Sequence, residues 1–359
     1  MPSKYHRISG YRDKELRSLS FYHMFRQLAF KLPAEFSHDA TLSLLKWLYL
    51  CRCLPKVKIP TAPVKIAGIK FPNRVGLAAG LDKNAKVVNA MHQLGFGFIE
   101  VGTVTPKPQL GNPKPRLFRL EKNKSLINCM GFNNLGVDTL IKQLEKIQPF
   151  TGVLGINIGK NKVTPILKAI DDYVECFNKV YPYASYITVN ISSPNTPDLR
   201  DLQHGHYLSG LLSALKTQQR NLSLKHRRYV PIWLKLAPDL MQQEIYDICH
   251  TLKYYEADGV IVNNTSINRN GLIEEANTQA TGGLSGQAIF EVSNQILTWV
   301  RATLPKPFPV IAVGGIMSAE DAYKKCQLGA DLIQLYTGLI YSGPALIMRC
   351  ALEIDKFFK

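Results

Sequence analysis

The sequence predicts an α/β protein, a (β/α)8 TIM barrel with an N-terminal helical hairpin. Short apolar runs, each long enough for one buried strand, recur from Arg74 onward. They lie at 75–78, 97–101, 153–156, 186–191, 231–236, 259–262, 309–313 and 332–336. Segments with a helical period separate most of them, as at 85–94, 137–147, 207–215, 244–254, 289–304 and 319–328. About eight strands, each followed by a helix, favour a closed barrel over an open sheet.

The residues that follow the apolar runs support the same fold and indicate a site. Nearly every run ends in a polar residue or a glycine pair, and barrel enzymes build their active sites at the carboxyl ends of their strands. In chain order these residues are Ala79–Gly80, Thr103, Asn157, Asn190, Lys235, Asn263–Asn264, Gly314–Gly315 and Tyr336–Thr337. They supply many hydrogen-bond donors and few carboxylates. Such a site suits an anionic, polar, planar ligand and a redox cofactor that performs the difficult step.

The segment at 186–200, YITVNISSPNTPDLR, shows this pattern most clearly. Its apolar first half predicts a buried strand, and its second half offers Asn190, Ser193 and Asn195 beside two prolines that fix the backbone. One interpretation is a catalytic loop, and the other is a loop whose Ser and Asn side chains only satisfy turn backbone groups. The recurrence of polar strand ends along the chain favours the catalytic interpretation.

Lys235 and a group of late glycines are further candidates for function. Lys235 lies in VPIWLKLAPD between apolar residues, and a lysine inside a barrel is costly unless a negative charge meets it. The alternative is a surface lysine whose stem lies along apolar groups. Glycines cluster near the last strands, where barrels bind phosphate through backbone N–H groups, although any tight turn also uses glycine. These glycines are Gly282, Gly283, Gly286, Gly314 and Gly315.

Two short helices are predicted before the barrel. Residues 14–32 carry apolar side chains at helical spacing until Pro33, and a second helix is expected from near Ser37 until Pro55. A proline-containing linker is expected at 56–68.

This organisation divides the chain into an N-terminal helical extension, residues 1–58, and a barrel, residues 59–359. The extension holds eleven Lys/Arg against four Asp/Glu, a net charge of +7. Its helices also carry more apolar surface than a hairpin can bury by itself. This surface either packs on the barrel or inserts into a membrane surface, and both alternatives remain open from the sequence.

Composition excludes several classes of protein. Seven scattered cysteines without a C-x-x-C pair argue against a disulfide framework, zinc or iron–sulfur, and no metal is expected. There is no H-E-x-x-H, no Walker A loop and no G-x-G-x-x-G after the first strand. The formal charge of +17 suits lipid headgroups or nucleic acid, or solubility alone. Aromatics are not interleaved with Lys/Arg in the barrel portion, so nucleic acid is not an expected partner.

Ten motifs in collinear order resemble dihydroorotate dehydrogenase over nearly the whole chain. They are GLAAGLDKN (76–84), EVGTVTP (100–106), GNPKPRLFRL (111–120), NCMGFNNLG (128–136), GINIGKNK (155–162), NISSPNTP (190–197), KLAPD (235–239), TGGLSG (281–286), AVGGI (312–316) and QLYTG (334–338). The chain resembles the membrane-associated, quinone-dependent class 2. Ser193 occupies the base position where the soluble class has cysteine, and the soluble class lacks the helical hairpin.

The resemblance implies roles for individual residues. Ser193 would be the general base, and Lys235 would stabilise the anionic reduced flavin. FMN would be held by Ala79, Gly80, Leu81, Asp82, Lys83, Thr103, Asn157, Asn190, Lys235, Asn263, Gly286, Gly315, Tyr336 and Thr337. Dihydroorotate would be held by Lys83, Asn128, Cys129, Met130, Gly131, Phe132, Asn190, Asn195, Asn264 and Thr265. His38, Arg119 and Tyr336 match positions that line the quinone tunnel of the family.

Two residues depart from the family pattern. Asn263 stands where the family usually has threonine, and Cys129 replaces a commonly basic residue. The implied activity is oxidation of (S)-dihydroorotate to orotate in pyrimidine biosynthesis, with FMN as hydride acceptor and a membrane quinone as final acceptor. The expected location is peripheral, on the cytoplasmic face of the bacterial inner membrane or, alternatively, on the mitochondrial inner membrane. The N-terminal helices would contact the membrane.

Two other functions compete with this interpretation. A flavin barrel that reduces a pyrimidine with a nicotinamide or fumarate partner would not need residues 1–58. A basic lipid- or nucleic-acid-binding protein without catalysis would be colourless when purified. The helical hairpin argues against the first. The second predicts aromatics interleaved with Lys/Arg on a surface strand or helix, which the barrel portion does not show.

Overall fold

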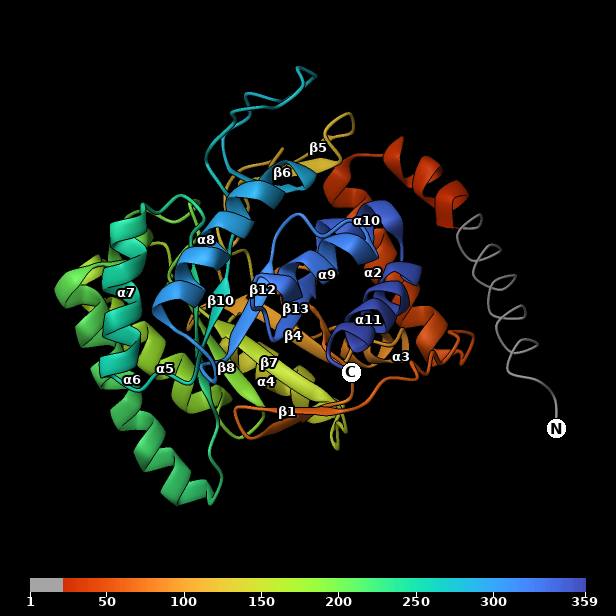
Figure 1. Cartoon of the computed structure of the whole chain (residues 1–359). Coiled ribbons are helices and arrows are strands. Elements are labelled where there is room, and N and C mark those ends of the chain that lie inside the picture. The colour runs from red at the N-terminus through yellow and green to blue at the C-terminus, as the bar shows by residue number, and fades with distance from the viewer. Residues whose placement is uncertain (1–21) are drawn as a thin grey trace.

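Eight parallel strands close into a barrel in the computed structural model, which describes residues 22–359 (Figure 1). Their order around the barrel is β10-β12-β13-β3-β4-β7-β8-β9, so barrel strands that follow one another in the chain are neighbours. The strands are β3 (Val75–Leu77), β4 (Phe98–Val104), β7 (Val153–Ile158), β8 (Tyr186–Asn190), β9 (Ile232–Leu236), β10 (Gly259–Val262), β12 (Val310–Val313) and β13 (Leu332–Leu335). Each predicted apolar run contributes one strand, so the predicted barrel is confirmed.

Helices follow the strands and pack around the outside of the barrel (Figure 1). They are α3 (Val88–Gln93), α4 (Val137–Lys146), α5 (Ala169–Val180), α6 (Gly205–His226), α7 (Gln242–Tyr254), α8 (Phe290–Thr303), α9 (Ala319–Gln327), α10 (Thr337–Ser342) and α11 (Ala345–Phe357). Short 3-10 turns are η1 (Ile166–Lys168), η2 (Leu199–Gln203) and η3 (Gln287–Ile289). The first helix predicted in the barrel, at 85–94, is α3 and begins only at Val88. The carboxylate of Asp82 accepts hydrogen bonds from the backbone N–H groups of Lys86 and Val87, which holds the preceding residues in a turn.

Aromatic side chains fill the amino-terminal end of the barrel. The rings of Phe98, Tyr186 and Trp233 are fully buried, and the Tyr186 centroid lies 6.3 Å from that of Phe98 and 5.9 Å from that of Trp233. Glycines make the room for them, since a Cβ at Gly155 would lie 2.2 Å from the Tyr186 ring and one at Gly259 2.5 Å from the Trp233 ring. This interior layer therefore depends on glycine in the neighbouring strands.

A two-stranded antiparallel hairpin covers the same end of the barrel. It consists of β1 (Val64–Ile66) and β2 (Ile69–Phe71), and the Phe71 ring packs 5.3 Å from the Phe98 ring. Part of the predicted linker is therefore a strand that packs on the barrel interior. The apolar pattern of VKIAGIKF is short, and two prolines precede it, which hides the strand in the sequence.

A three-stranded antiparallel sheet lies at the opposite, carboxyl end of the barrel. It has the order β11-β6-β5 and consists of β5 (Leu117–Leu120), β6 (Ser125–Asn128) and β11 (Gly283–Gly286). Its own small core contains Leu120, Ile127, Leu284 and Ile289. The sheet joins two segments far apart in the sequence, and it brings Asn128 opposite Gly283. The sequence pattern does not predict it, since the strands are short and two of them end in glycine or asparagine.

The predicted helical hairpin lies beside this sheet (Figure 1). Residues 22–30 are helical, and α2 runs from Ala34 to Leu50. The start of the first predicted helix, residues 14–21, lies outside the described residues. The second helix begins at Ala34 rather than near Ser37, because Pro33 precedes it where the missing N–H of proline costs nothing. The Ser37 hydroxyl instead donates to the Ala29 carbonyl at 2.7 Å and ties the two helices together.

Two arginines attach the hairpin to the sheet. Arg119 on β5 donates to the carbonyls of Phe30 at 3.1 Å and Leu32 at 2.7 Å, so its charge lies at the carboxyl end of the first helix. Arg116 forms an ion pair with Glu35 at 2.7 Å, and this pairing lowers the pKa of the Glu35 carboxyl. The hairpin is therefore docked beside the carboxyl end of the barrel, on the side of the polar strand ends.

Candidate active site

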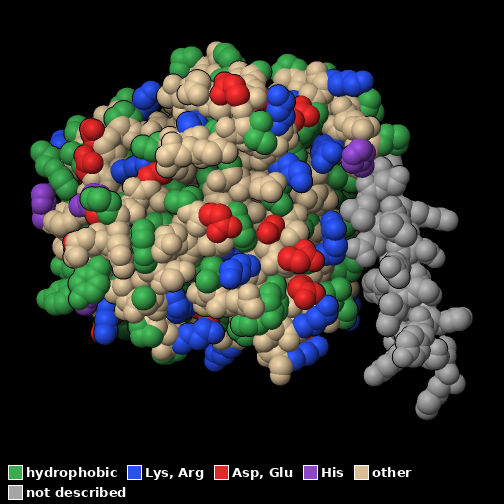
Figure 2. Space-filling model, turned by 45° about the horizontal axis from the view of Figure 1, so that its top comes forward, with side chains coloured by type: hydrophobic (Ala, Val, Ile, Leu, Met, Phe, Trp, Pro, Cys, Tyr) green, Lys and Arg blue, Asp and Glu red, His purple; other side chains and the backbone are tan. Residues whose placement is uncertain are grey.

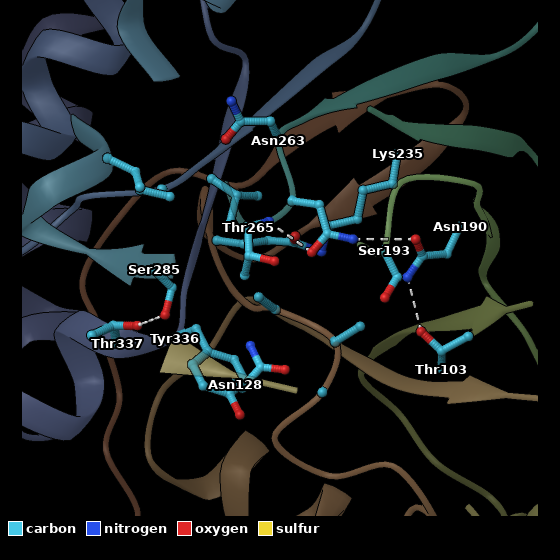
Figure 3. Close-up of a pocket in the computed structure, with 18 of the residues that line it drawn as sticks. Thr103, Asn128, Asn190, Ser193, Lys235, Asn263, Thr265, Ser285, Tyr336 and Thr337 are labelled. Carbon is cyan, nitrogen blue, oxygen red and sulfur yellow. Dashed lines mark hydrogen bonds between the residues drawn. The ribbon is translucent and has the colours of Figure 1, made fainter. Parts of the chain in front are cut away.

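A pocket with an empty volume of about 990 Å³, which includes space open to solvent, lies at the carboxyl ends of the barrel strands (Figure 3). Residues at or after the ends of β3, β4, β8, β9, β10, β12 and β13 line it, together with β6 and β11 of the small sheet. Figure 3 shows Lys235, Asn190 and Ser193 on one side of the pocket and Ser285 and Thr337 on the other. The polar strand ends thus meet in one place, as a closed barrel requires.

Most of the predicted site residues line this pocket. They are Ala79, Gly80, Lys83, Thr103, Asn128, Met130, Gly131, Phe132, Asn190, Ser193, Asn195, Lys235, Asn263, Asn264, Thr265, Gly286, Gly315, Tyr336 and Thr337. Six others lie outside the lining, and two of these, His38 and Arg119, are described with the hairpin below. Leu81 is in the apolar core, Asp82 holds the turn before α3, Asn157 lies behind Thr103, and the Cys129 backbone pairs with Arg116.

A fully buried carboxylate, that of Glu100 on β4, lies beneath the pocket. Four side-chain donors converge on it. Oε1 accepts from Asn157 Nδ2 at 2.8 Å, and Oε2 accepts from the Tyr186 hydroxyl at 3.0 Å, the Thr188 hydroxyl at 3.1 Å and Gln334 Nε2 at 2.8 Å. Donors from three other strands therefore compensate the burial of this charge.

The carboxylate orients a chain of hydrogen bonds that ends at the pocket. Because Asn157 donates its Nδ2 to Glu100, its Oδ1 faces Thr103, whose hydroxyl donates to it at 2.6 Å. The Thr103 oxygen in turn accepts from Asn190 Nδ2 at 2.9 Å (Figure 3). The amide of Asn190 is thereby fixed, and its Oδ1 accepts from Asn264 Nδ2 at 3.3 Å. Each amide in the chain has one orientation only.

Two lysines supply the positive charge of the pocket. Burial lowers the pKa of Lys235, and the charge of Glu100 opposes that shift. Burial also lowers the pKa of Lys83 to about 8, with the charge of Arg116 as the second cause. Among the pocket-lining residues within 22–359 there is no Asp or Glu. The pocket is therefore electropositive and suits an anionic ligand.

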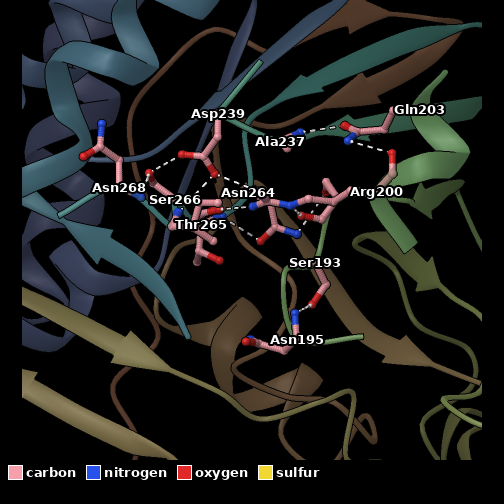
Figure 4. Close-up of polar contacts among 12 residues, drawn as sticks. Ser193, Asn195, Arg200, Gln203, Ala237, Asp239, Asn264, Thr265, Ser266 and Asn268 are labelled. Carbon is pink, nitrogen blue, oxygen red and sulfur yellow. Dashed lines mark hydrogen bonds and ion pairs between the residues drawn. The ribbon is translucent and has the colours of Figure 1, made fainter. Parts of the chain in front are cut away.

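Ser193 lies on the irregular segment between β8 and η2 (Figure 4). Its side chain is buried, and its Oγ accepts a hydrogen bond from the Asn195 backbone N–H at 3.2 Å. Asn195 Nδ2 donates to the Asn128 carbonyl at 3.0 Å, which joins the loop to the small sheet. The buried hydroxyl of Thr196 has no hydrogen-bond partner within the described part of the chain.

Asn263 and Gln334 line the pocket and have buried amide atoms without partners among residues 22–359. Neither Nδ2 nor Oδ1 of Asn263 has a partner among residues 22–359, although the side chain is only 1% exposed. Gln334 Oε1 is likewise unpaired within that range. Buried amides without partners are rare in folded proteins because each costs about 1–3 kcal/mol. They indicate a polar ligand with its own donors and acceptors at this place.

Glycines and hydroxyls form the far end of the pocket. Gly286 has a φ of +101°, and a Cβ there would lie 2.5 Å from the Lys124 carbonyl oxygen. Gly315 has a φ of +75°, and a Cβ there would lie 2.4 Å from the Cα of Phe290. The hydroxyls of Ser285 and Thr337 are 2.9 Å apart beside them. Only glycine fits at both positions, and backbone N–H groups with hydroxyls are the usual surroundings of a bound phosphate.

Of the three predicted quinone residues, His38 lies on α2 of the helical hairpin, and Arg119 lies on β5 and contacts the hairpin. Burial, reinforced by the charge of Lys83, lowers the pKa of His38 on α2 to about 4, so this imidazole is neutral at pH 7. Arg119 binds the end of the first helix, as described above. Tyr336, the third, lines the pocket, and burial raises its pKa to about 12.

Several residues of the site are not among the sequence predictions. They are Glu100, Ser285, Ile289, Ile316 and Gln334. A signal exists for two of them, since Glu100 and Gln334 are polar residues inside otherwise apolar strands, at FIEV and LIQL. A charged residue in the middle of a barrel strand must meet partners inside the barrel. Ser285 gives no such signal, because its strand is recognised only in three dimensions.

A barrel with a donor-rich, electropositive pocket at its carboxyl end is the architecture of many cofactor-dependent enzymes. The family model for dihydroorotate dehydrogenase matches residues 61–358. The chain therefore belongs to the dihydroorotate dehydrogenase family, which confirms the resemblance found in the sequence. Within residues 22–359 no cluster of side chains suited to a metal ion is present. None of the helices there combines the length and apolarity needed to cross a bilayer.

Individual relatives and solved structures show which members of this family the chain is similar to. A protein of Neisseria meningitidis serogroup B named dihydroorotate dehydrogenase (quinone) is 51% identical over 92% of this chain and 98% of its own length. One of the same name from Idiomarina loihiensis is 52% identical over 91% and 98%. A crystal structure of DHODH from Eimeria tenella in complex with ferulenol superposes with a TM-score of 0.82 at 37% identity, covering 89% of this chain and 90% of that one.

Truncation of the buried amides Asn157 and Asn263 should lower the free energy of unfolding by different amounts in protein stripped of bound ligand. Asn157→Ala removes two hydrogen bonds and should lower the free energy of unfolding by about 2–4 kcal/mol. Asn263→Ala removes no side-chain hydrogen bond to residues 22–359 and should change the free energy of unfolding by less than about 1 kcal/mol. Urea unfolding of both variants measures the difference. Equal losses would show that Asn263 has protein partners.

Proposed function

We propose that this protein oxidises (S)-dihydroorotate to orotate, with FMN as hydride acceptor and a membrane quinone as final electron acceptor. The observation that carries the proposal is the convergence of Ser193, Lys83 and Lys235 with a group of asparagines in one pocket, where residues 22–359 place no carboxylate in the lining. The relatives at about 50% identity carry the name dihydroorotate dehydrogenase (quinone), and their sequences align over nearly their whole length.

The pocket fits FMN on two grounds. The unpaired amide of Asn263 offers a donor and an acceptor to a polar ring edge. Gly286 and Gly315, with the hydroxyls of Ser285 and Thr337, suit a phosphate. The chemistry supplied by the bound FMN is acceptance of a hydride from dihydroorotate and reoxidation by quinone. The further FMN residues implied by the resemblance are Ala79, Gly80, Leu81, Asp82, Thr103, Asn157, Asn190, Lys235 and Tyr336.

Dihydroorotate would lie among the asparagines. Its ring presents alternating N–H and C=O groups, and the pocket is lined by Asn128, Asn195 and Asn264, whose amides carry both donor and acceptor atoms. Lys83 would pair with the carboxylate of the substrate, since its pKa of about 8 leaves it cationic at pH 7. Residues 129–132, Asn190 and Thr265 complete the proposed contacts.

Ser193 would remove the ring proton, and Lys235 would stabilise the negative charge that develops on the cofactor. A serine hydroxyl is a poor base, so its proton must pass onward. The unpaired hydroxyl of Thr196, three residues away in the same buried loop, is a suitable next carrier together with a water molecule. Glu100 supports Lys235 in this role because its charge raises the pKa of the ammonium.

Ser193→Ala should slow reduction of the bound flavin by dihydroorotate about 10²–10⁴-fold, the usual worth of a positioned base. The affinity for orotate should change far less, because the asparagines carry the binding. Stopped-flow absorbance measures the rate, and equilibrium titration measures the affinity. A small loss of rate with a large loss of affinity would instead make Ser193 a binding residue.

The hairpin would dock on the membrane and admit the quinone. One face of α2 packs on the core through Leu45 and Leu48. The other face exposes apolar side chains at helical spacing, among them Phe36 (59% exposed), Leu44 (42%) and Trp47 (58%). Met24 and Leu28 extend this exposed apolar surface onto the first helix. Lateral insertion of such a surface suits peripheral attachment, which we assign to the cytoplasmic face of a bacterial inner membrane.

The quinone would reach the flavin from the side of the helical hairpin, by a path separate from that of the substrate. His38, Arg119 and Tyr336 would line this path. The neutral imidazole of His38 suits an uncharged quinone head. On the face shown in Figure 2, basic side chains form no continuous patch that would compete as a binding surface. Lys and Arg are dispersed there among acidic and hydrophobic side chains.

Replacing both Phe36 and Trp47 by Ser should weaken binding to anionic lipid vesicles at least about tenfold, since each large apolar side chain contributes roughly 1.5–3 kcal/mol when buried. Reduction of a long-tailed quinone in vesicles should fall with it, while reduction of the flavin by dihydroorotate should not. Tyr254→Ser is the matched control, because Tyr254 is 80% exposed on α7, on the other side of the barrel (Figure 1). Equal vesicle binding by both variants would refute attachment through the hairpin.

A further inference from the structure

The loop that carries Ser193 is held by contacts outside the barrel ladder. Strand β8 ends at Asn190, and the chain next becomes regular at η2, which begins at Leu199. Between them Asp198 adopts a left-handed backbone with φ of +56°. The position of Ser193 therefore depends on side-chain contacts to neighbouring segments, made by Asn195 with Asn128, by Asn264 with Ser192 and by Arg200 with Ser192 (Figure 4).

The guanidinium of Arg200 joins three segments. Its Nε donates to the carbonyl of Ser192, the residue directly before Ser193, at 3.2 Å. Its Nη2 donates to the carbonyl of Thr265, in the loop after β10, at 3.1 Å. Its Nη1 forms an ion pair with the carboxylate of Asp239, in the loop after β9, at 2.9 Å. One planar group thus fixes both the base loop and the substrate-side loop.

Asp239 completes the arrangement from the other side. Its Oδ1 accepts a short hydrogen bond from the Ser266 hydroxyl, and its Oδ2 accepts from the Ile267 backbone N–H at 3.0 Å. The two side chains of the pair are 22% and 14% exposed, so solvent screens the pair only in part. Asp239 therefore holds Arg200 and the loop after β10 in one fixed relation.

Gln203 adds an independent link at the end of the same segment. Its Oε1 accepts from the Ala237 backbone N–H at 2.9 Å, two residues after Lys235, and its Nε2 donates to the Arg200 carbonyl at 3.3 Å. The loop with Ser193 is consequently connected to the ends of both β9 and β10, which carry Lys235 and Asn264 into the pocket.

We propose that Arg200 and Asp239 are positioning residues that hold the Ser193 hydroxyl at a fixed place relative to Thr265 across the substrate site. This inference rests on the proposed function of Ser193 as the base. Neither residue lines the pocket, and the family resemblance implies a role for neither, although Asp239 ends the KLAPD motif. They act by fixing the carbonyls next to Ser193 and within Thr265. Small displacements of a reacting group can lower a rate about 10²-fold, so this constraint bears directly on proton removal.

Two substitutions test the clamp formed by Arg200 and Asp239. Arg200→Lys keeps the charge but cannot make three bonds in one plane, and Asp239→Asn keeps the shape but removes the charge. Each should slow flavin reduction at saturating dihydroorotate about 10–100-fold in the FMN-loaded full chain. The dissociation constant of orotate should rise much less than the rate falls. The double variant should be little slower than the slower single one, because both changes break the same unit.

The matched control is Arg301→Lys. Arg301 also pairs with a carboxylate, Asp331, at 3.0 Å, with side chains 13% and 16% exposed, and it donates to the carbonyls of Leu304, Phe308 and Gly329, away from the pocket. It should lower thermal stability without slowing flavin reduction. Backbone amide exchange at 191–199 should accelerate several-fold in Arg200→Lys and stay unchanged in the control.

The outcomes separate the clamp from the proposed function. If dihydroorotate fails to reduce the flavin of the unsubstituted chain, the proposed function itself is wrong. If it does so, and the Arg200 and Asp239 variants stay within about twofold of that rate, the clamp is wrong. The clamp is also wrong if Arg301→Lys slows the reaction equally, or if orotate affinity falls as far as the rate. Should Arg200→Lys fail to fold, Asp239→Asn decides the question by the same criteria.

Discussion

The carboxylate of Glu100 in the closed interior of the barrel is the constraint on which the rest of the site depends. It is fully buried, and its charge is tolerable only because Asn157, Tyr186, Thr188 and Gln334 donate to it. These donors come from different strands, so the carboxylate also fixes how the strands present their side chains. Through Asn157 it sets the direction of every hydrogen bond out to Asn190, and its charge opposes the lowering of the Lys235 pKa by burial. The buried carboxylate of Glu100 beneath the pocket therefore fixes the orientation of polar side chains that line it.

The two ends of the barrel have different roles: the amino-terminal end is packed with apolar side chains, and the carboxyl end holds the polar pocket. At the amino-terminal end, large rings pack against glycines, and the β1–β2 hairpin covers them. At the carboxyl end, polar atoms without partners remain in the pocket, notably both amide atoms of Asn263 within the described chain. Such groups are rare in folded proteins, and in a pocket they are consistent with a polar ligand that would satisfy them. The packing below provides the rigidity that lets the pocket keep this arrangement.

The barrel and most of the pocket were predictable from the sequence, because strand periodicity and polar strand ends are local signals. Lys235 was recognisable as a charged residue among apolar neighbours, and Glu100 carries the same signal, although only the structure shows the donors that surround it. The small sheet was not predictable, since Asn128 and Gly283 pair across more than half of the barrel sequence. The start of α2 depends on Pro33 and on the contact of Ser37 with Ala29, which is a tertiary contact. Likewise, Arg200 appears in the sequence as an ordinary loop residue, and its three partners become neighbours only after folding.

The central claim is that this pocket binds FMN and transfers hydride to it from dihydroorotate. The most direct measurement is anaerobic spectroscopy of the full chain purified without added flavin. The account predicts a yellow protein that releases FMN on denaturation, loses its flavin absorbance when dihydroorotate is added, and recovers it when a quinone follows. A folded protein that is colourless and binds no FMN would contradict the proposed function. So would a protein whose bound FMN stays oxidised after dihydroorotate is added.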